Sequence, residues 1–276
     1  MEFKYFSRNG QLRPMSEATV PLGNIEYSYG FGVYESIRVS GGIVYFLDDH
    51  IERLTESARI IGLEHTYTPE LVRKSIAELL QKNDAETCNV KILLIGGREP
   101  EDAQLNILCL NPLFPDKKMY RDGVACVTYA YERAFPHAKT LNMLHSYLAY
   151  GAAKKAGAYD ALLVDREGRI AEGTRTNFFC IKGKAIFTPD EENILLGVTR
   201  KAVLKIAAKS GYEIEQKDIR LADLAGYDGA FLTSTSSKIL PIRAIDDFSF
   251  GEQPESLKEL MTAFDAFLDG CGGKMN

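Results

Sequence analysis

The chain has 276 residues, of which 45% are hydrophobic and 26% charged, and its formal net charge is -5. This length suits one large domain or two, and the composition is typical of a globular protein with a sizeable core. A negative charge without a long basic tract makes nucleic acid an unexpected partner.

Other classes of protein are also disfavoured. No apolar run approaches membrane-spanning length, and residues 1–6 lack the apolar stretch of a signal peptide, so we expect a cytoplasmic protein with no membrane partner. The five cysteines are scattered, odd in number and without CxxC spacing, which favours buried, reduced thiols.

The first part of the chain alternates predicted strands with predicted helices. Residues 42–47 read as a buried strand, and a helix with one apolar face follows at 51–62. A second helix is predicted to begin at Thr68, because Pro69 suits the first helical position. Strands are expected at 90–95 and 105–110.

Residues 111–118 contain two prolines and three charged residues, which favours a boundary between two domains. We therefore predict a small N-terminal α/β domain at 1–115, an interdomain linker at 116–122 and a large C-terminal domain at 123–276. The fold class expected is α/β (α+β).

The predicted C-terminal domain begins with a strand at 124–131, followed by a helix at 144–156 and a series of short strands. A further helix is expected at 199–210. The last helix has apolar residues at helical spacing between residues 257 and 268.

Several familiar sites are disfavoured by spacing. Gly30-Phe31-Gly32 begins like a dinucleotide fingerprint, but Glu35 stands where the third glycine belongs. The chain has no GxxxxGK[ST] element and no GxSxG elbow. Its four histidines lack HExxH spacing and lie far in sequence from any cysteine pair, so no metal site is expected.

Lys139 and the Glu172-Gly173 pair suggest one particular chemistry. A lysine amine forms a Schiff base with the aldehyde of pyridoxal 5'-phosphate, and a carboxylate can pair with the protonated pyridine nitrogen of that cofactor. Each residue alone is commonplace, so the suggestion depends on finding groups that bind the phosphate.

Three segments could bind a phosphate, and each has a plainer interpretation. Arg53 lies on the polar side of a predicted helix, where an arginine is usually just solvated. Gly197-Val198-Thr199 precedes a helix whose free N–H groups attract anions, although Thr199 could simply cap that helix. The five hydroxyls of residues 233–237 form either a satisfied turn or an oxyanion cradle.

The order Arg53, Lys139, Glu172, Gly197-Val198-Thr199 and Thr233-Ser234-Thr235 resembles that of the class IV (fold-type IV) pyridoxal-phosphate aminotransferases. These include D-amino acid transaminases, branched-chain aminotransferases and aminodeoxychorismate lyases. The resemblance extends from Tyr29 to Pro241. It implies a larger C-terminal domain with a mixed, barrel-like sheet, and a homodimer with active sites near the interface.

The resemblance also implies a role for each matching residue. Lys139 would be the catalytic lysine, which later moves a proton between substrate Cα and cofactor C4′. Glu172 would keep the pyridine nitrogen protonated. The phosphate would be bound by Arg53, Val198, Thr199, Ser234 and Thr235. Tyr34 and Glu35 would line the substrate pocket, although a strand edge also explains them.

Within this family the chain looks most like a D-amino acid transaminase, because Asn142 follows Lys139 by three residues. Such an enzyme transfers nitrogen from a D-amino acid to a 2-oxo acid by ping-pong kinetics. Glu35-Ser36-Ile37-Arg38 points instead to an L-branched-chain amino acid aminotransferase. A carbon–carbon lyase of the aminodeoxychorismate type is the third alternative.

Recognition of the substrate carboxylate is the main departure from the D-amino acid enzymes, which use an Arg-x-His pair on a loop. Here Arg98 is followed by Glu99 and Pro100. A buried carboxylate still needs a cation, and the candidates are Arg98, Arg38 and Lys238. Our hypothesis is that Lys238, which follows the hydroxyl turn, helps to bind the carboxylate; an exposed turn lysine is an equally good interpretation.

Overall fold

The computed structural model describes residues 2–271, and these form two compact units. The first unit contains the chain up to Leu113 together with His137–Met143, and the second contains Phe114–Pro136 and Leu144–Gly270. Lys139 therefore belongs to the first unit, whereas the sequence-based division placed it in the C-terminal domain. Backbone pairing explains the difference, because the Tyr34 N–H donates to the Lys139 carbonyl at 2.9 Å and the Leu141 N–H donates to the Gly32 carbonyl at 2.8 Å.

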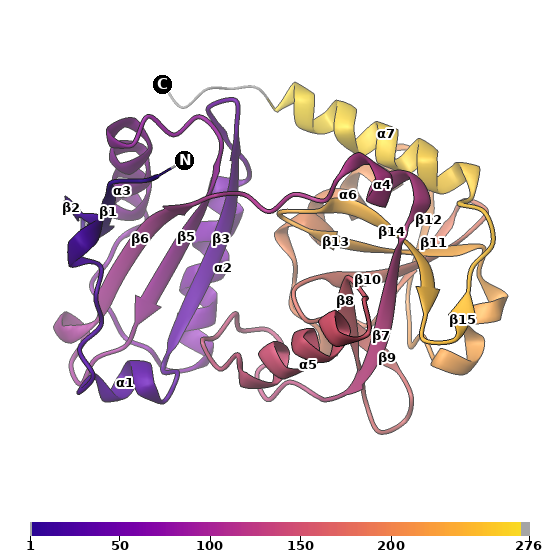
Figure 1. Ribbon diagram of the computed structural model, residues 1–276, viewed down its shortest axis with the longest axis horizontal. Coiled ribbons are helices and arrows are strands. Elements are labelled where there is room, and N and C mark those ends of the chain that lie inside the picture. The colour runs from indigo at the N-terminus through magenta and orange to yellow at the C-terminus, as the bar shows by residue number, and fades with distance from the viewer. Residues whose placement is uncertain (1, 272–276) are drawn as a thin grey trace. The chain divides into compact units, whose positions relative to one another are not determined.

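The first unit is built on a six-stranded antiparallel sheet with the order β2-β1-β6-β5-β3-β4 (Figure 1). Its strands are β1 (Tyr5–Arg8), β2 (Gln11–Pro14), β3 (Gly32–Ser40), β4 (Ile43–Val44), β5 (Cys88–Ile95) and β6 (Gln104–Leu110). Helices α2 (Leu47–Ile60) and α3 (Pro69–Lys82) pack against the sheet, and the short helix α1 (Ile25–Ser28) precedes β3.

Local signals account for both long helices of this unit. Thr68 caps α3 by accepting a hydrogen bond from the Leu71 N–H at 3.2 Å, as the Thr68-Pro69 pair predicted.

The strand expected at 42–47 is only the two-residue β4. The chain turns there because Phe46 has a left-handed backbone (φ 56°) and α2 starts at Leu47.

The second unit has a nine-stranded mixed sheet, in which β7-β8, β7-β14 and β11-β12 pair in parallel. The strands are β7 (Val124–Ala130), β8 (Asp160–Val164), β9 (Ile170–Gly173), β10 (Asn177–Lys182), β11 (Ala185–Thr188), β12 (Glu213–Gln216), β13 (Gly229–Ser234), β14 (Lys238–Ile245) and β15 (Phe248–Ser249).

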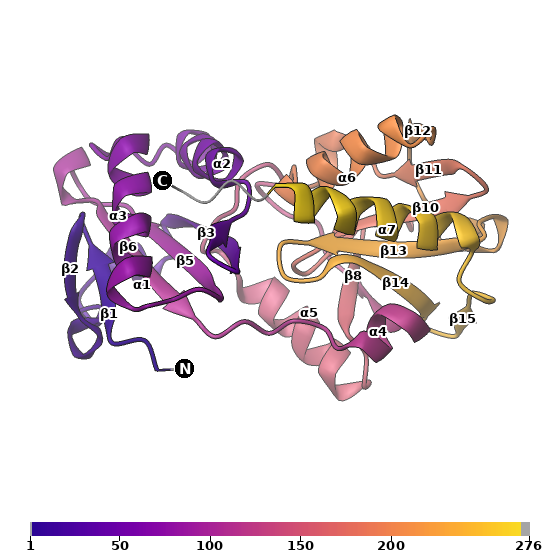
Figure 2. The same ribbon diagram turned by 90° about the horizontal axis from the view of Figure 1, so that it is seen from above.

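Four helices accompany this sheet. They are α4 (Lys117–Asp122), α5 (Leu144–Lys155), α6 (Val198–Lys209) and α7 (Glu255–Gly270). Figure 2 shows α6 and α7 side by side, α6 packing on β13 and α7 on β14. The linker predicted at 116–122 is instead mostly α4, since the Asp116 side chain caps its N-terminus by accepting the Met119 N–H at 2.9 Å.

Each unit has its own apolar core, and the mixed α/β class predicted from sequence is confirmed. Cys88, Cys109, Cys126 and Cys180 are buried free thiols, and Cys271 is a partly exposed one. Within residues 2–271, none of the helices combines the length and apolar character needed to cross a bilayer.

Candidate active site

Lys139 lies beside the N-terminal end of β3. Its main chain is held on both sides: the Lys139 N–H donates to Ser57 Oγ at 3.0 Å, and its carbonyl accepts the Tyr34 N–H. Lys139 Nζ lies 4.5 Å from the centroid of the buried Tyr34 ring, within the range of a cation–π contact. The predicted catalytic lysine and the predicted pocket residue Tyr34 are therefore neighbours.

A second amine shares the Tyr34 ring, and the sequence analysis did not single it out. Lys91 Nζ lies 3.7 Å from the centroid of that ring. Burial lowers the pKa of Lys91; the Tyr34 hydroxyl and Glu35 oppose this effect, while the charge of Lys139 adds to it. The sequence did contain a signal for it, because Lys91 lies in the middle of the apolar segment 88–95, where a lysine is unusual.

Glu35 and Arg53 form a buried ion pair. Arg53 Nε donates to Glu35 Oε1 at 2.7 Å, and Arg53 Nη2 donates to Oε2 at 2.8 Å. His50 Nδ1 lies 2.7 Å from the same Oε2, which can only accept, so its N–H donates. Burial alone would raise the pKa of Glu35, but the charges and hydrogen bonds of Arg53 and His50 hold it far below its ordinary value.

This pairing places two predicted site residues in unexpected surroundings. Alternate residues of a strand point to opposite faces, so Glu35 points toward α2 while Tyr34 points to the other face of the sheet. Two arms of the Arg53 fork, which was predicted to clamp the phosphate, already bind Glu35. Phosphate binding by Arg53 and substrate contact by Glu35 remain predictions.

The three candidate cations for the substrate carboxylate lie in different places. Arg38 is half-buried and shares a face of β3 with Tyr34, whereas Arg98 is exposed in the loop after β5. Lys238 Nζ pairs with Asp265 Oδ1 of α7 at 2.7 Å, and both side chains are partly exposed. A substrate carboxylate that binds Lys238 would have to compete with the carboxylate of Asp265 for the Lys238 amine.

In the second unit, Glu172 on β9 is surrounded by hydrogen-bond donors. Arg133 Nε donates to its Oε1 at 2.6 Å. Its Oε2 accepts the Leu195 N–H at 3.1 Å and the side-chain amide of Asn177 at 3.3 Å. Because every one of these groups donates, the arrangement favours a carboxylate over a carboxylic acid at Glu172.

The turn after Glu172 is supported by a buried carboxylate. Asp160 Oδ1 accepts the Thr174 hydroxyl and the Ala161 N–H (2.9 Å), and Oδ2 accepts the Thr176 hydroxyl at 3.0 Å. A Cβ at Gly173 would overlap the Thr176 hydroxyl, which explains the glycine after Glu172. Asp160 thus fixes the backbone that carries Glu172.

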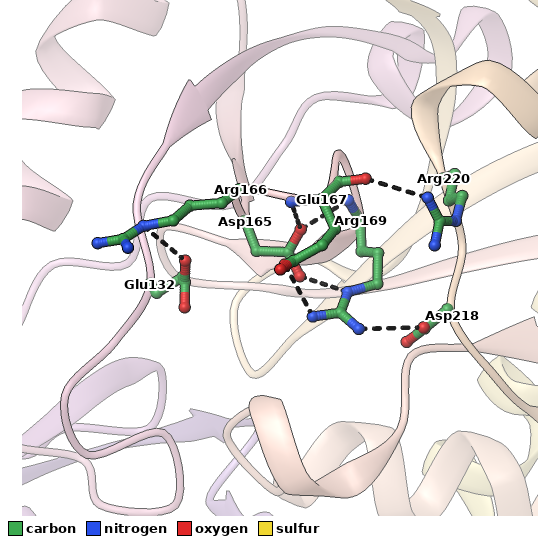
Figure 3. A network of polar contacts seen from close by, with 7 residues as sticks. All are labelled: Glu132, Asp165, Arg166, Glu167, Arg169, Asp218 and Arg220. Atoms are coloured by element: carbon green, nitrogen blue, oxygen red, sulfur yellow. Dashed lines mark hydrogen bonds and ion pairs between the residues drawn. The ribbon is translucent and has the colours of Figure 1, made fainter.

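The hairpin of β8 and β9 that carries Glu172 is also closed by a network of surface charges (Figure 3). Arg169 reaches Asp165 (2.5 Å), Glu167 (3.0 Å) and Asp218 (3.3 Å). No bond of this network is made to the Glu172 carboxylate, and we assign its ion pairs a structural role.

The N-terminus of α6 fits a phosphate group. Its N-cap is Gly197, which makes no side-chain cap hydrogen bond to the helix, and a Cβ at Gly197 would overlap Asn177 Oδ1. Asn177 also donates to the Leu195 carbonyl at 2.7 Å. One amide therefore joins Glu172 to the segment before Val198 and Thr199, whose N–H groups can bind an anion.

The hydroxyl segment after β13 is a tight turn. Ser234 Oγ accepts the Ser237 N–H at 3.1 Å and lies 2.7 Å from Ser237 Oγ. Ser234 is therefore hydrogen-bonded within the turn, which agrees with the interpretation of residues 233–237 as a satisfied turn. Thr235 is partly exposed at the same turn, and both remain predicted phosphate ligands.

Comparison with known proteins decides the family. The family model described as amino-transferase class IV matches residues 32–245, a span that includes Tyr34, Lys139, Glu172 and Thr235.

The chain is a class IV aminotransferase.

Members of this family depend on pyridoxal phosphate, and one similar solved structure, of a branched-chain aminotransferase, contains pyridoxamine 5'-phosphate. The predicted cofactor and fold-type IV architecture are therefore confirmed. The chain is 31% identical over 252 residues to the D-alanine aminotransferase of Bacillus licheniformis, covering 88% of this chain and 89% of that one.

Two further solved structures of branched-chain aminotransferases are also similar to this class IV aminotransferase. The enzyme from Thermoproteus uzoniensis, with norvaline, is 28% identical with a TM-score of 0.87, covering 98% of this chain and 96% of that one. A mutant of the enzyme from Thermobaculum terrenum is 25% identical with a TM-score of 0.86, covering 98% and 94%.

Proposed function

We propose that this class IV aminotransferase transfers the amino group between a D-amino acid and a 2-oxo acid. The observation that carries the proposal is the short segment Lys139-Thr140-Leu141-Asn142, with asparagine three residues after the lysine. Its backbone is fixed on β3, where the Leu141 N–H bonds to Gly32. The similarity to a D-alanine aminotransferase supports the same choice.

The proposed chemistry gives each predicted site residue one task. Pyridoxal phosphate, when bound through Lys139, supplies an electron sink for the carbanion at substrate Cα. Lys139 Nζ would be the group that removes the Cα proton of the substrate and moves it toward the cofactor. As a carboxylate, Glu172 would keep the pyridine nitrogen protonated, and the α6 N-terminus with Ser234 and Thr235 would bind the phosphate.

The substrate carboxylate is proposed to meet a cation, because an unpaired buried charge is costly. Lys238 remains our first candidate, with Arg38 and Arg98 as alternatives. Arg38 is supported by its position on the same face of β3 as Tyr34.

An L-branched-chain aminotransferase is the second candidate, favoured by the similar structures and by Glu35-Ser36-Ile37-Arg38. A carbon–carbon lyase would use the same lysine and release pyruvate, and it is the third.

A half-reaction assay separates these functions. Purified holoenzyme is mixed with D-alanine or D-glutamate, and separately with L-leucine, and the cofactor absorbance is followed. Conversion to the pyridoxamine form by the D-amino acids supports the proposal. Conversion with L-leucine only would replace it with the branched-chain function, and conversion with neither would favour the lyase.

We also propose that the chain acts as a homodimer. Helix α5 exposes Leu144, Tyr147 and Leu148, which lie on one face at spacings of three and four residues. A second copy of the chain would cover this apolar face. Light scattering of the wild type and of Tyr147→Asp tests this: a monomeric wild type, or an unchanged dimer in the variant, would contradict the assignment of this face.

A further inference from the structure

Arg133 is hydrogen-bonded to Glu172 and belongs to none of the predicted site groups. It lies in the segment after β7, and 19% of its side chain is exposed against 4% for Glu172. Its Nε–Glu172 Oε1 distance of 2.6 Å is short, as expected for a charge-assisted hydrogen bond.

The rest of the Arg133 guanidinium is held in place. Nη1 donates to Ser146 Oγ on α5 at 3.1 Å, and Nη2 donates to the Thr174 carbonyl at 3.1 Å. The planar group is thus oriented by α5 and by the turn that follows Glu172, while its Nε faces the carboxylate.

A fixed cation at this position has a chemical consequence. A carboxylate next to a permanent positive charge binds protons weakly, and arginine stays charged at every physiological pH. A proton shared between Glu172 and a heterocyclic nitrogen is therefore driven toward the nitrogen.

We propose that Arg133 is a positioning residue that keeps Glu172 ionised, so that the proton shared with the pyridine nitrogen of the cofactor stays on that nitrogen. Because this role of Arg133 involves only the cofactor, it is the same for a D- and for an L-amino acid substrate.

The direct test is the protonation state of the ring nitrogen. Wild type, Arg133→Met and Arg133→Lys are reconstituted with pyridoxal phosphate labelled with ¹⁵N in the ring, and the ¹⁵N chemical shift is measured at one pH. We expect a protonated nitrogen in the wild type and in Arg133→Lys, and a shift toward the unprotonated value in Arg133→Met. A protonated nitrogen in Arg133→Met would overturn the proposal.

A binding measurement separates this role from a merely structural one. The apoenzymes are titrated with pyridoxal phosphate and with its 1-deaza analogue, whose ring carbon accepts no proton. We expect the preference for pyridoxal phosphate over the analogue to fall about tenfold in Arg133→Met, which corresponds to one charge-assisted hydrogen bond. An equal loss of affinity for both ligands would overturn the proposal.

Two controls keep the test decisive. Ser146→Ala removes one partner of Arg133 without touching its bond to Glu172, and its ¹⁵N shift should match the wild type. If Arg133→Met does not fold, Arg133→Gln replaces it with the same expectations. Because no substrate is added, a failure of the proposed D-amino acid function would leave every one of these results unchanged.

Discussion

Arg53 and Glu35 meet through two parallel hydrogen bonds of 2.7 and 2.8 Å, although 18 residues separate them in the chain. The carboxylate is fully buried, with His50 as its third neighbour. This pair joins α2 to β3, the strand against which the backbone of Lys139 is held.

Replacing Glu35 with Gln should weaken the first unit strongly. Removing one partner of a buried ion pair typically costs on the order of 3–5 kcal/mol, because the other charge stays buried. Urea unfolding measures the loss, and Arg59→Gln, which breaks an exposed pair with Glu56, is the matched control. A loss no larger than that of the control would show that the buried pair contributes little.

The same pair should make stability depend on acid. Folding lowers the pKa of Glu35 from its ordinary value of 4.5, so its stabilising contribution is full above that pH and is lost as the pH falls below it. The free energy of unfolding, measured between about pH 6 and pH 3, should therefore fall less steeply in Glu35→Gln than in the wild type. Parallel curves would contradict the prediction.

Lys139 should carry the cofactor covalently. Borohydride reduction of the holoenzyme should add a phosphopyridoxyl group to the peptide containing Lys139, which mass spectrometry detects. Lys139→Ala should show no such group, whereas Lys91→Met, the neighbouring amine on the Tyr34 ring, should still be labelled at Lys139. A label on Lys91 in the wild type would reverse the assignment.

Gly197→Ala should disturb the phosphate site. The added methyl would overlap Asn177 Oδ1, and such overpacking costs about 1–3 kcal/mol in stability. Fluorescence titration should show weaker binding of pyridoxal phosphate. At Gly226 a Cβ would meet nothing within 4 Å, so Gly226→Ala should bind the cofactor like the wild type. Equal affinities in the two variants would argue against a phosphate at the α6 N-terminus.

Lys238→Ala tests carboxylate recognition. Because its pair with Asp265 is partly exposed, stability should change by less than about 1 kcal/mol. The KM for D-alanine should rise in Lys238→Ala and should not rise in Asp265→Ala, which removes the competing carboxylate. An unchanged KM in Lys238→Ala would leave Arg38 and Arg98 as the candidates.

Part of this protein could be read from short stretches of sequence. The start of α3 at Thr68-Pro69 was predicted because capping involves only neighbouring residues. Lys139, Glu172 and the α6 N-terminus were predicted as site groups because the chemistry requires particular residue types in a particular order. That order was enough to predict the class IV aminotransferase family and its cofactor, both of which the comparisons confirmed.

Two features of the chain differ from the division expected from sequence. The stretch predicted as a linker at 116–122 is mostly the helix α4, whose local cap by Asp116 the sequence analysis did not consider. The segment around Lys139 follows the predicted boundary in sequence, yet it is bonded to β3 and so belongs to the first unit.

The sequence by itself therefore determined which groups are present for the chemistry, because the reactivity of a lysine or a carboxylate belongs to the side chain. Only the tertiary structure decided what those groups touch. Arg53 binds Glu35, and Lys91 contacts the same Tyr34 ring as Lys139. Arg133 binds Glu172, although 39 residues separate the two in the chain. Such pairs form when strands and helices bring distant residues together, and no local pattern records them.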